Sequence, residues 1–114
     1  MRNCVYVLEC KGLYKIGRTG NFPDRLKQLR TSNPFDFQVA HLIYTNDNTK
    51  VEEALHLIFA ESRVNGEWFN LSVREIAQIR SMSIQAILTL GASLKPKPEK
   101  DGPYIDPNQT TFSW

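Results

Sequence analysis

The densest group of cations next to a glycine in this chain is the stretch YKIGRT, residues 14–19, where Lys15 and Arg18 flank Gly17. The stretch has the composition of a β-strand, and a basic segment containing Pro23 follows it. Two interpretations are open: an exposed strand edge, or the wall of a site that holds a negatively charged ligand. Gly17 and the nearby Gly20 would allow the backbone a close approach at this point.

Charge is distributed unevenly along the chain. The 114 residues carry a net charge of +2, which is too small to indicate nucleic-acid binding by itself. Residues 1–36, however, contain seven lysines and arginines against three acidic residues, a net charge of +4, so the rest of the chain carries about −2. One end of the fold is therefore expected to be basic, and this end contains residues 14–19.

The composition indicates a single globular domain that needs neither disulfides nor a structural metal. No apolar run is long enough to span a membrane, and the N-terminus lacks the pattern of a signal peptide. Cys4 and Cys10 lie six residues apart in one expected strand, and no other cysteine or histidine cluster completes a zinc site. We therefore expect reduced, buried thiols and a cytoplasmic protein, in a bacterium or, for a phage-encoded protein, in its host.

Hydrophobic periodicity and turn signals predict the elements that must position these residues. In chain order they are a strand at 4–10, a strand at 13–19, a helix from Pro23 that ends before Pro34, a strand at 35–44, a helix at 45–63, a short extended piece at 64–71 and a helix at 72–91. The first two strands would form a hairpin through the turn at 11–12. This order predicts a small α+β layer structure.

The expected helices carry their own signals. Leu26 and Leu29 would face inward from the first helix. The last helix would open with a capping box, Ser72 and Glu75, and end at Gly91. Its inward positions would be Ile76, Ile79, Ile84 and Ile87. We place the domain at residues 1–92 and a proline-rich tail, extended or disordered, at residues 93–114.

Five short motifs together resemble the GIY-YIG nuclease superfamily. They are VYV (5–7), YKIGRT (14–19), PDRLKQL (23–29), VEEALHLIF (51–59) and GEWFNL (66–71). The resemblance covers residues 3–72 and is strongest to the branch found in phage open reading frames and in a meiotically up-regulated yeast gene product. It implies a layered α+β fold with an antiparallel three-stranded sheet and flanking helices. It also implies a hydrolase of phosphodiester bonds that uses one divalent ion, Mg²⁺ or Mn²⁺.

The resemblance assigns roles to three residues near the start of the chain. Tyr6 matches the tyrosine that orients or deprotonates the attacking water, and Arg25 matches the helix arginine that would grip the scissile phosphate. Lys15 stands where the superfamily usually has its second tyrosine, and it would supply positive charge and a proton donor. By residue type alone, Tyr6 is typical of a core aromatic and Arg25 of a solvated helix charge, so these roles depend on the resemblance.

The resemblance also implies that Glu52 is the metal ligand, because its motif places the glutamate three residues before Leu55. One carboxylate suffices chemically, since Mg²⁺ retains several waters. Two alternatives stay open: Glu52 could cap its helix through a Thr49-to-Glu52 capping box, or Glu53 could be the ligand. His56 lies four residues after Glu52 on the same helical face, where it could orient Glu52, move a proton, contact phosphate or simply be a boundary residue.

We therefore expect an endonuclease-type domain of the phage or mobile-element kind that binds double-stranded DNA through its basic face. Arg18, Lys27 and Arg30 would contact phosphates without reading bases. The alternative is a weakly active or inactive domain of the same fold that binds or inhibits a host or partner protein, in which the aromatic residues Phe112 and Trp114 of the tail could take part. A third reading is a DNA-binding module without chemistry. No membrane partner is expected.

Overall fold

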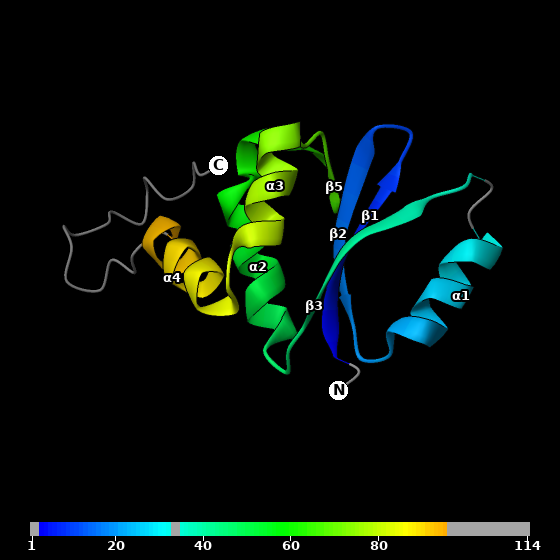
Figure 1. Ribbon diagram of the computed structural model, residues 1–114, viewed down its shortest axis with the longest axis horizontal. Coiled ribbons are helices and arrows are strands. Elements are labelled where there is room, and N and C mark those ends of the chain that lie inside the picture. The colour runs from blue at the N-terminus through cyan, green and yellow to red at the C-terminus, as the bar shows by residue number, and fades with distance from the viewer. Residues whose placement is uncertain (1–2, 33–34, 96–114) are drawn as a thin grey trace, which may run out of the picture.

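The computed structural model describes residues 3–32 and 35–95, and it shows an antiparallel sheet with helices on both sides (Figure 1). The sheet has five strands in the order β3-β1-β2-β5-β4. The α+β fold class is therefore confirmed, although the expected sheet had three strands. Of the predicted tail, residues 96–114 lie outside the described residues, and so do Phe112 and Trp114.

The first five elements follow the predicted order, and the segment after the fifth element is divided further than predicted. In chain order the elements are β1 (Cys4–Cys10), β2 (Leu13–Thr19), α1 (Phe22–Ser32), β3 (Gln38–Tyr44), α2 (Asn48–Ile58), a 3-10 turn (Ala60–Ser62), β4 (Arg63–Asn65), β5 (Trp68–Phe69), α3 (Val73–Ser81) and α4 (Ile84–Leu94). No helix among residues 3–32 and 35–95 is long and apolar enough to cross a membrane.

Strand β1 lies at the centre of the three long strands and is buried on both faces, as its apolar sequence predicts. Its side chains alternate between two cores. Val5 and Val7 pack in the core under α2, α3 and α4, whereas Tyr6 and Leu8 pack in a second core under α1. Figure 1 shows α1 on one side of the sheet and α2 and α3 on the other. The two cysteines are free and buried, as expected.

The β1–β2 hairpin turns at Lys11 and Gly12, whose φ angles are +53° and +85°. Two consecutive positive φ values are typical of a two-residue type I′ turn, which matches the twist of the flanking strands. The resulting register sets Tyr6 opposite Gly17 and Val5 opposite Arg18. The turn therefore determines which residues of β1 and β2 share a face.

The sheet is wider than predicted because residues 63–69 form a second hairpin, β4–β5, that pairs with the outer edge of β2. These strands have only three and two residues. Such short segments carry no periodic signal, which is why the sequence indicated only an extended piece. The hairpin covers β2 over a short distance, at Tyr14 and Lys15.

The predicted single helix at 72–91 is wrong, because it is two helices. The capping box of Ser72 and Glu75 begins α3 as expected. Met82 is then extended, and the side chain of Ser83 accepts a hydrogen bond from the backbone N–H of Ala86 to begin α4. Both helices bury apolar residues at helical spacing, so the periodicity continues across the break and conceals it.

The expected helix end at Gly91 is also wrong, since α4 continues to Leu94, two residues past the expected domain boundary. Gly91 is buried where α4 crosses α2. A Cβ at position 91 would lie 2.5 Å from the Cβ of Ala54 and 2.9 Å from its Cα. This glycine therefore allows two helices to approach closely, which is a tertiary requirement without a local signature.

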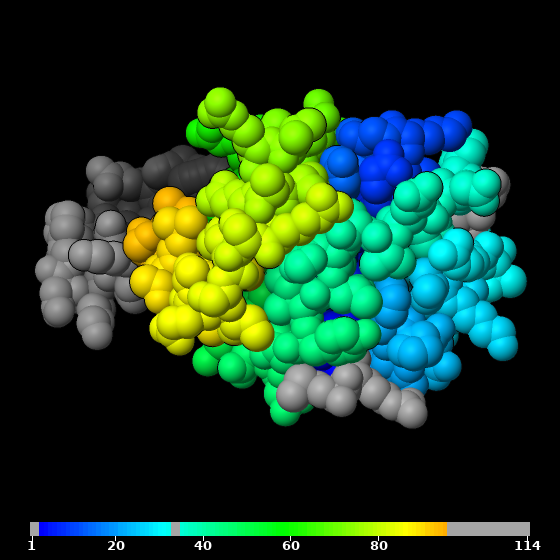
Figure 2. All heavy atoms as spheres, in the orientation of Figure 1, coloured from blue at the N-terminus to red at the C-terminus, as the bar shows by residue number. Residues whose placement is uncertain are grey.

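Figure 2 shows α1 at one end of the molecule and α3 and α4 toward the other, with residues of β3 and α2 between them. The exposed Lys27 and Arg30 belong to α1. Two of the seven cations of residues 1–36 are thus exposed at the α1 end.

Candidate active site

The candidate site lies at the outer edge of β2. Beyond the short pairing with β5, the backbone N–H of Ile16 donates to the carbonyl of Glu67 at 2.9 Å, and no described strand pairs with this edge further along. The edge that β5 leaves uncovered faces α2. Side chains from β2 and from α2 meet there.

Glu52 points from α2 toward this edge and is only 8% exposed. The Nε of Arg18 donates to its Oε1 at 3.0 Å. Its Oε2 is buried and has no hydrogen-bond partner among the described residues, with the Nε2 of His56 3.9 Å away. A buried carboxylate oxygen without a donor is energetically costly, so this atom is suited to accept a ligand.

The position of Glu52 within α2 decides between its alternative roles. The helix α2 has Asp47 at its N-cap and begins at Asn48, so Glu52 lies in its second turn and cannot cap it. The capping-box interpretation is therefore wrong. Glu53 is exposed to solvent, whereas Glu52 is buried beside Arg18. The geometry thus favours Glu52 over Glu53 as the residue of the site.

The pKa of Glu52 is raised to about 7, first by burial and then by the negative charge of Glu67, with the cation of Arg18 opposing both. The nearness of the Glu67 carboxyl group acts in the same direction as burial, because two adjacent carboxyl groups favour the protonated form. Arg18 therefore does not hold the pKa of Glu52 at its ordinary value. A further cation beside Glu52 would lower this pKa.

Glu67 is the residue that sequence reasoning missed. It directly precedes β5, and its Oε1 forms an ion pair with the Nζ of Lys15 at 3.1 Å. Glu67 is thus bound to one cation of YKIGRT while its charge acts on Glu52, which is paired with the other cation, Arg18. The only signal in the sequence was an acidic residue inside the GEWF motif.

His56 is held firmly in place. Its Nε2 lies 3.0 Å from the carbonyl oxygen of Ile16, and its ring meets the ring of Phe69 edge-on with centroids 5.0 Å apart. Because a carbonyl can only accept, Nε2 carries the hydrogen in this contact. His56 therefore anchors α2 to β2 at the turn of α2 that carries Glu52.

Tyr6 and Arg25 form a second group on the α1 side of the sheet. The Nε of Arg25 donates to the Tyr6 hydroxyl at 3.4 Å, a long contact, and the Tyr6 ring packs against Phe22. Tyr6 is 1% exposed and lies across Gly17, where a Cβ would be 2.6 Å from its hydroxyl oxygen. Arg25 does not pair with Asp24, which accepts from Asn21 instead.

The segment 15–18 of β2 lies between the two groups. On one face Gly17 makes room for Tyr6, and on the other Ile16 and Arg18 hold His56 and Glu52. No hydrogen bond or ion pair among the described residues joins Tyr6 and Arg25 directly to the carboxylate group. The predicted site residues are therefore adjacent, in two groups on opposite faces of one strand.

Glu52 and His56 also line a groove of about 820 Å³. Its wall includes α4, which packs against α2. Three cations line this groove, Lys50, Arg63 and Lys95. The groove therefore borders Glu52, and its lining carries these three cations against two carboxylates, those of Glu52 and Glu53.

The predicted phosphate-contact residues have different positions. Arg18 is half exposed, but its guanidinium is engaged with Glu52. Lys27 is exposed on α1, and the guanidinium of Arg30 lies 4.9 Å from the ring centroid of Phe37. Lys27 and Arg30 can therefore reach a ligand without breaking an ion pair, and their phosphate contacts stay a prediction.

No group of three or more His, Cys, Asp or Glu side chains among the described residues is arranged to enclose a metal ion. The unpartnered Oε2 of Glu52 with a second carboxylate nearby nevertheless fits an ion such as Mg²⁺, which takes one or two carboxylates and keeps several waters. The residues present are thus compatible with a water-rich ion and not with an all-protein cage.

Comparison with known proteins places these residues in a family. Uncharacterized protein 460R of Invertebrate iridescent virus 6 is 35% identical over 80 residues, a match that covers 64% of this chain and 36% of the viral protein. The chain thus spans about a third of the length of that relative, and no solved structure gives a significant match. The profile of the T5orf172 domain, a phage-associated domain related to nuclease folds, matches residues 3–83. With more than two thirds of its length matched, this chain belongs to the T5orf172 domain family.

Proposed function

We propose that this domain is a metal-dependent endonuclease that hydrolyses phosphodiester bonds of nucleic acid, as the GIY-YIG nucleases that its motifs resemble do. One observation carries the proposal: the buried Oε2 of Glu52 has no partner, beside a second carboxylate and the cations Arg18 and Lys15. A nuclease-like domain family and a basic face support it. DNA is the expected substrate.

Glu52, with Glu67 beside it, would hold one Mg²⁺ or Mn²⁺ ion. Such an ion would neutralise charge on the non-bridging phosphate oxygens. His56 would act as a positioning residue, because its Nε2–H already donates to the carbonyl oxygen of Ile16 and its ring packs on Phe69. The Arg18 guanidinium would keep Oε1 of Glu52 oriented, so that Oε2 stays directed at the ligand.

On the opposite face, Arg25 would bind the phosphate. Among the described residues, its Nε and Nη1 make only long contacts of 3.4 Å, to Tyr6 and Gln28, and a guanidinium has five N–H donors. The Tyr6 oxygen would hold and orient the attacking water and, once its own proton has been lost to solvent, would take the proton of that water as a phenolate. Lys15, released from Glu67, would donate a proton to the leaving oxygen. These roles require the phosphate to lie across residues 15–18, between the two groups.

The test uses purified protein with Mg²⁺ or Mn²⁺ on plasmid, linear duplex and single-stranded DNA. We expect cleavage by the wild type and a loss of about 100-fold or more in Glu52→Gln. Calorimetric Mn²⁺ binding should disappear in Glu52→Gln and persist in Glu53→Gln and in the exposed-site control Glu61→Gln. The proposal fails if all three DNA forms stay intact with either ion, and cleavage by Glu52→Ala would overturn the metal assignment.

One observation favours the second candidate, a domain that binds nucleic acid without cleaving it. Glu52 is already paired with Arg18, as it would be if its role were that of a structural ion pair. This candidate predicts salt-sensitive DNA affinity that is unchanged in Glu52→Ala, together with no Mn²⁺ binding. Binding to a host or partner protein stays a prediction, which a pull-down with and without residues 95–114 would test.

A further inference from the structure

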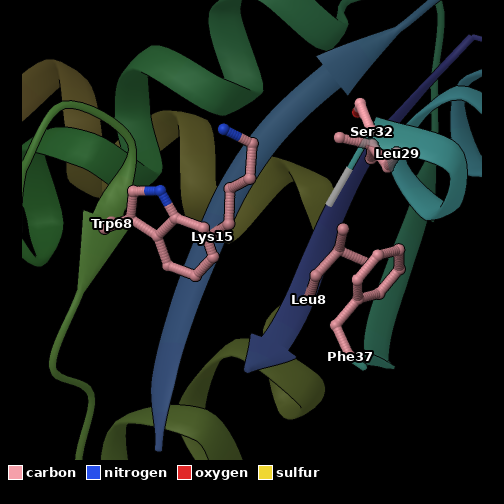
Figure 3. Close-up of a pocket in the computed structure, with 6 residues that line it drawn as sticks. All are labelled: Leu8, Lys15, Leu29, Ser32, Phe37 and Trp68. Atoms are coloured by element: carbon pink, nitrogen blue, oxygen red, sulfur yellow. The ribbon is translucent and has the colours of Figure 1, made fainter. Parts of the chain in front are cut away.

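A second hollow lies on the α1 side of the sheet and is separate from the groove at Glu52. It has a volume of about 240 Å³, and we call it the Trp68 pocket. Figure 3 shows the Trp68 indole on one side of Lys15, with Leu8, Phe37, Leu29 and Ser32 on the other. The pocket is lined by Leu8, Lys15, Leu29, Ser32, Phe37 and Trp68.

The lining combines a flat aromatic wall with a single cation. Trp68 is half-buried, whereas Leu8 and Phe37 are almost fully buried and form a rigid apolar floor. The Nζ of Lys15 lies 5.5 Å from the centroid of the Trp68 ring and is paired with Glu67. Four of the six lining residues are apolar, so a bare phosphate or metal ion would not be stabilised there.

Cations stand beside the aromatic residues of the pocket. Arg30 lies over Phe37 at the α1 wall. Lys15 is paired with Glu67, whose carboxylate acts on Glu52. A phosphate attached to a flat ring in the pocket would reach Lys15 by replacing the Glu67 carboxylate, toward the proposed catalytic edge.

We propose that the Trp68 pocket binds one unpaired nucleobase by stacking on the Trp68 indole, with Lys15 contacting the phosphate of that nucleotide. A base inside a duplex has no free face for such stacking, so the ligand is a single strand or a duplex with an unpaired nucleotide. The inference rests on the proposed function in taking nucleic acid as the ligand. It adds a preference for unpaired over continuous duplex substrates.

Trp68 fluorescence gives a direct readout of occupancy. The chain has two tryptophans, so Trp114→Phe leaves Trp68 as the sole emitter. In EDTA, to prevent cleavage, a single-stranded oligothymidylate and a blunt two-strand duplex with one bulged thymidine should quench this emission. The same blunt duplex without the bulge, in which every base is paired, should not quench it. Equal quenching by the fully paired duplex, or quenching by none of the three, would overturn the proposal.

Two variants test the contribution of the pocket to affinity by anisotropy of labelled DNA. Trp68→Leu should weaken binding of the single strand and of the bulged blunt duplex by about 5- to 100-fold, the typical effect of losing one base–aromatic stack. Because Trp68 is partly in the core, Ser32→Trp provides a second variant, which fills the pocket mouth from an exposed position. Thr31→Trp, at the residue just before Ser32 in α1 and outside the lining, is the matched control. It should bind both DNA forms with the wild-type affinity.

The outcomes separate this inference from the proposed function. If both pocket variants bind unpaired DNA as tightly as the wild type while the wild type cleaves DNA, the pocket proposal is wrong and the nuclease stands. If Trp68 is quenched and both variants weaken binding but no DNA is cleaved with Mg²⁺ or Mn²⁺, the pocket is supported and the nuclease proposal fails.

Discussion

Gly17 lies directly opposite Tyr6 on the neighbouring strand, and the tyrosine ring fills the space that a side chain at position 17 would need. A Cβ at this position would come within 2.6 Å of the Tyr6 hydroxyl oxygen and 2.7 Å of the ring carbon that bears it. The glycine of YKIGRT is therefore a requirement of the buried tyrosine. Because Gly17 leaves room for Tyr6 on one face of β2, and Arg18 and Ile16 bind α2 side chains on the other, this one strand contacts both groups of candidate site residues.

Gly17→Ala should displace Tyr6 and lower the free energy of unfolding by about 1–3 kcal/mol, because the added methyl overpacks a buried contact. Urea denaturation measures the change. Gly20→Ala is the matched control, since its Cβ would meet only the Oδ1 of the Asn3 side chain, at 3.3 Å. Equal stability of Gly17→Ala and wild type would contradict the packing described for Tyr6.

Gly91→Ala should destabilise the protein even though alanine is a better helix former by about 1 kcal/mol. The new methyl would meet Ala54 on α2, so the steric cost should exceed the gain in helix propensity. Adding Ala54→Gly removes one of the two clashing carbons, and the double variant should recover part of the loss. Strictly additive effects in this double-mutant cycle would show that α2 and α4 do not touch at these residues.

Tyr6→Phe should keep the fold and lose cleavage by about 100-fold or more, because it removes only the hydroxyl that would orient the water. Arg25→Lys should likewise reduce cleavage, since lysine keeps the charge without the guanidinium fork. Thermal unfolding and initial cleavage rates separate the two effects. The control is Tyr44→Phe, on the exposed part of β3, which should cleave at the wild-type rate.

The stability of the metal-free protein should depend on Glu52. Its folded-state pKa of about 7 lies above the ordinary value of 4.5, so folding favours the protonated form. The stabilising contribution is complete below pH 4.5 and is lost as the pH rises through 7, on the order of 3 kcal/mol in total. Urea unfolding in EDTA at pH 5 and pH 8 measures this loss.

The Gln side chain of Glu52→Gln does not titrate. The free energy of unfolding of this variant should therefore change less between pH 5 and pH 8 than that of the wild type. Glu61→Gln, at an exposed position, should retain the wild-type dependence. If Glu52→Gln and the wild type lose the same stability between pH 5 and pH 8, the raised pKa of Glu52 is not the cause.

Local signals predicted several elements correctly. The turn at Lys11 and Gly12, the capping box of Ser72 and the inward positions of α1 all depend on a few neighbouring residues, and the structure confirms them. The break at Met82 was missed because both helices continue one apolar period. Gly91 was misread as a helix end, since a glycine needed for close helix packing resembles a C-terminal cap.

The candidate site, too, could be predicted from the sequence only in part. Its residue types, Tyr6, Lys15, Arg25, Glu52 and His56, were recognisable from short motifs in the sequence. Their contacts were not, because Arg18 and Glu52 are 34 positions apart and His56 and Ile16 are 40 apart. The β2 edge and α2 determine these pairs. Glu67 could not be identified at all before the short hairpin β4–β5 placed it beside Lys15.

By itself the sequence determined the order of the first five elements, the turn between β1 and β2 and the basic first third of the chain, since these follow from local conformational preference and charge. Only the tertiary structure decided that the cations of YKIGRT are paired with carboxylates and that Gly17 accommodates a tyrosine ring. The physical reason is that β2 is covered by β5 over only two residues. The remaining edge is open to side chains from α2, and no local pattern encodes which of them meet there.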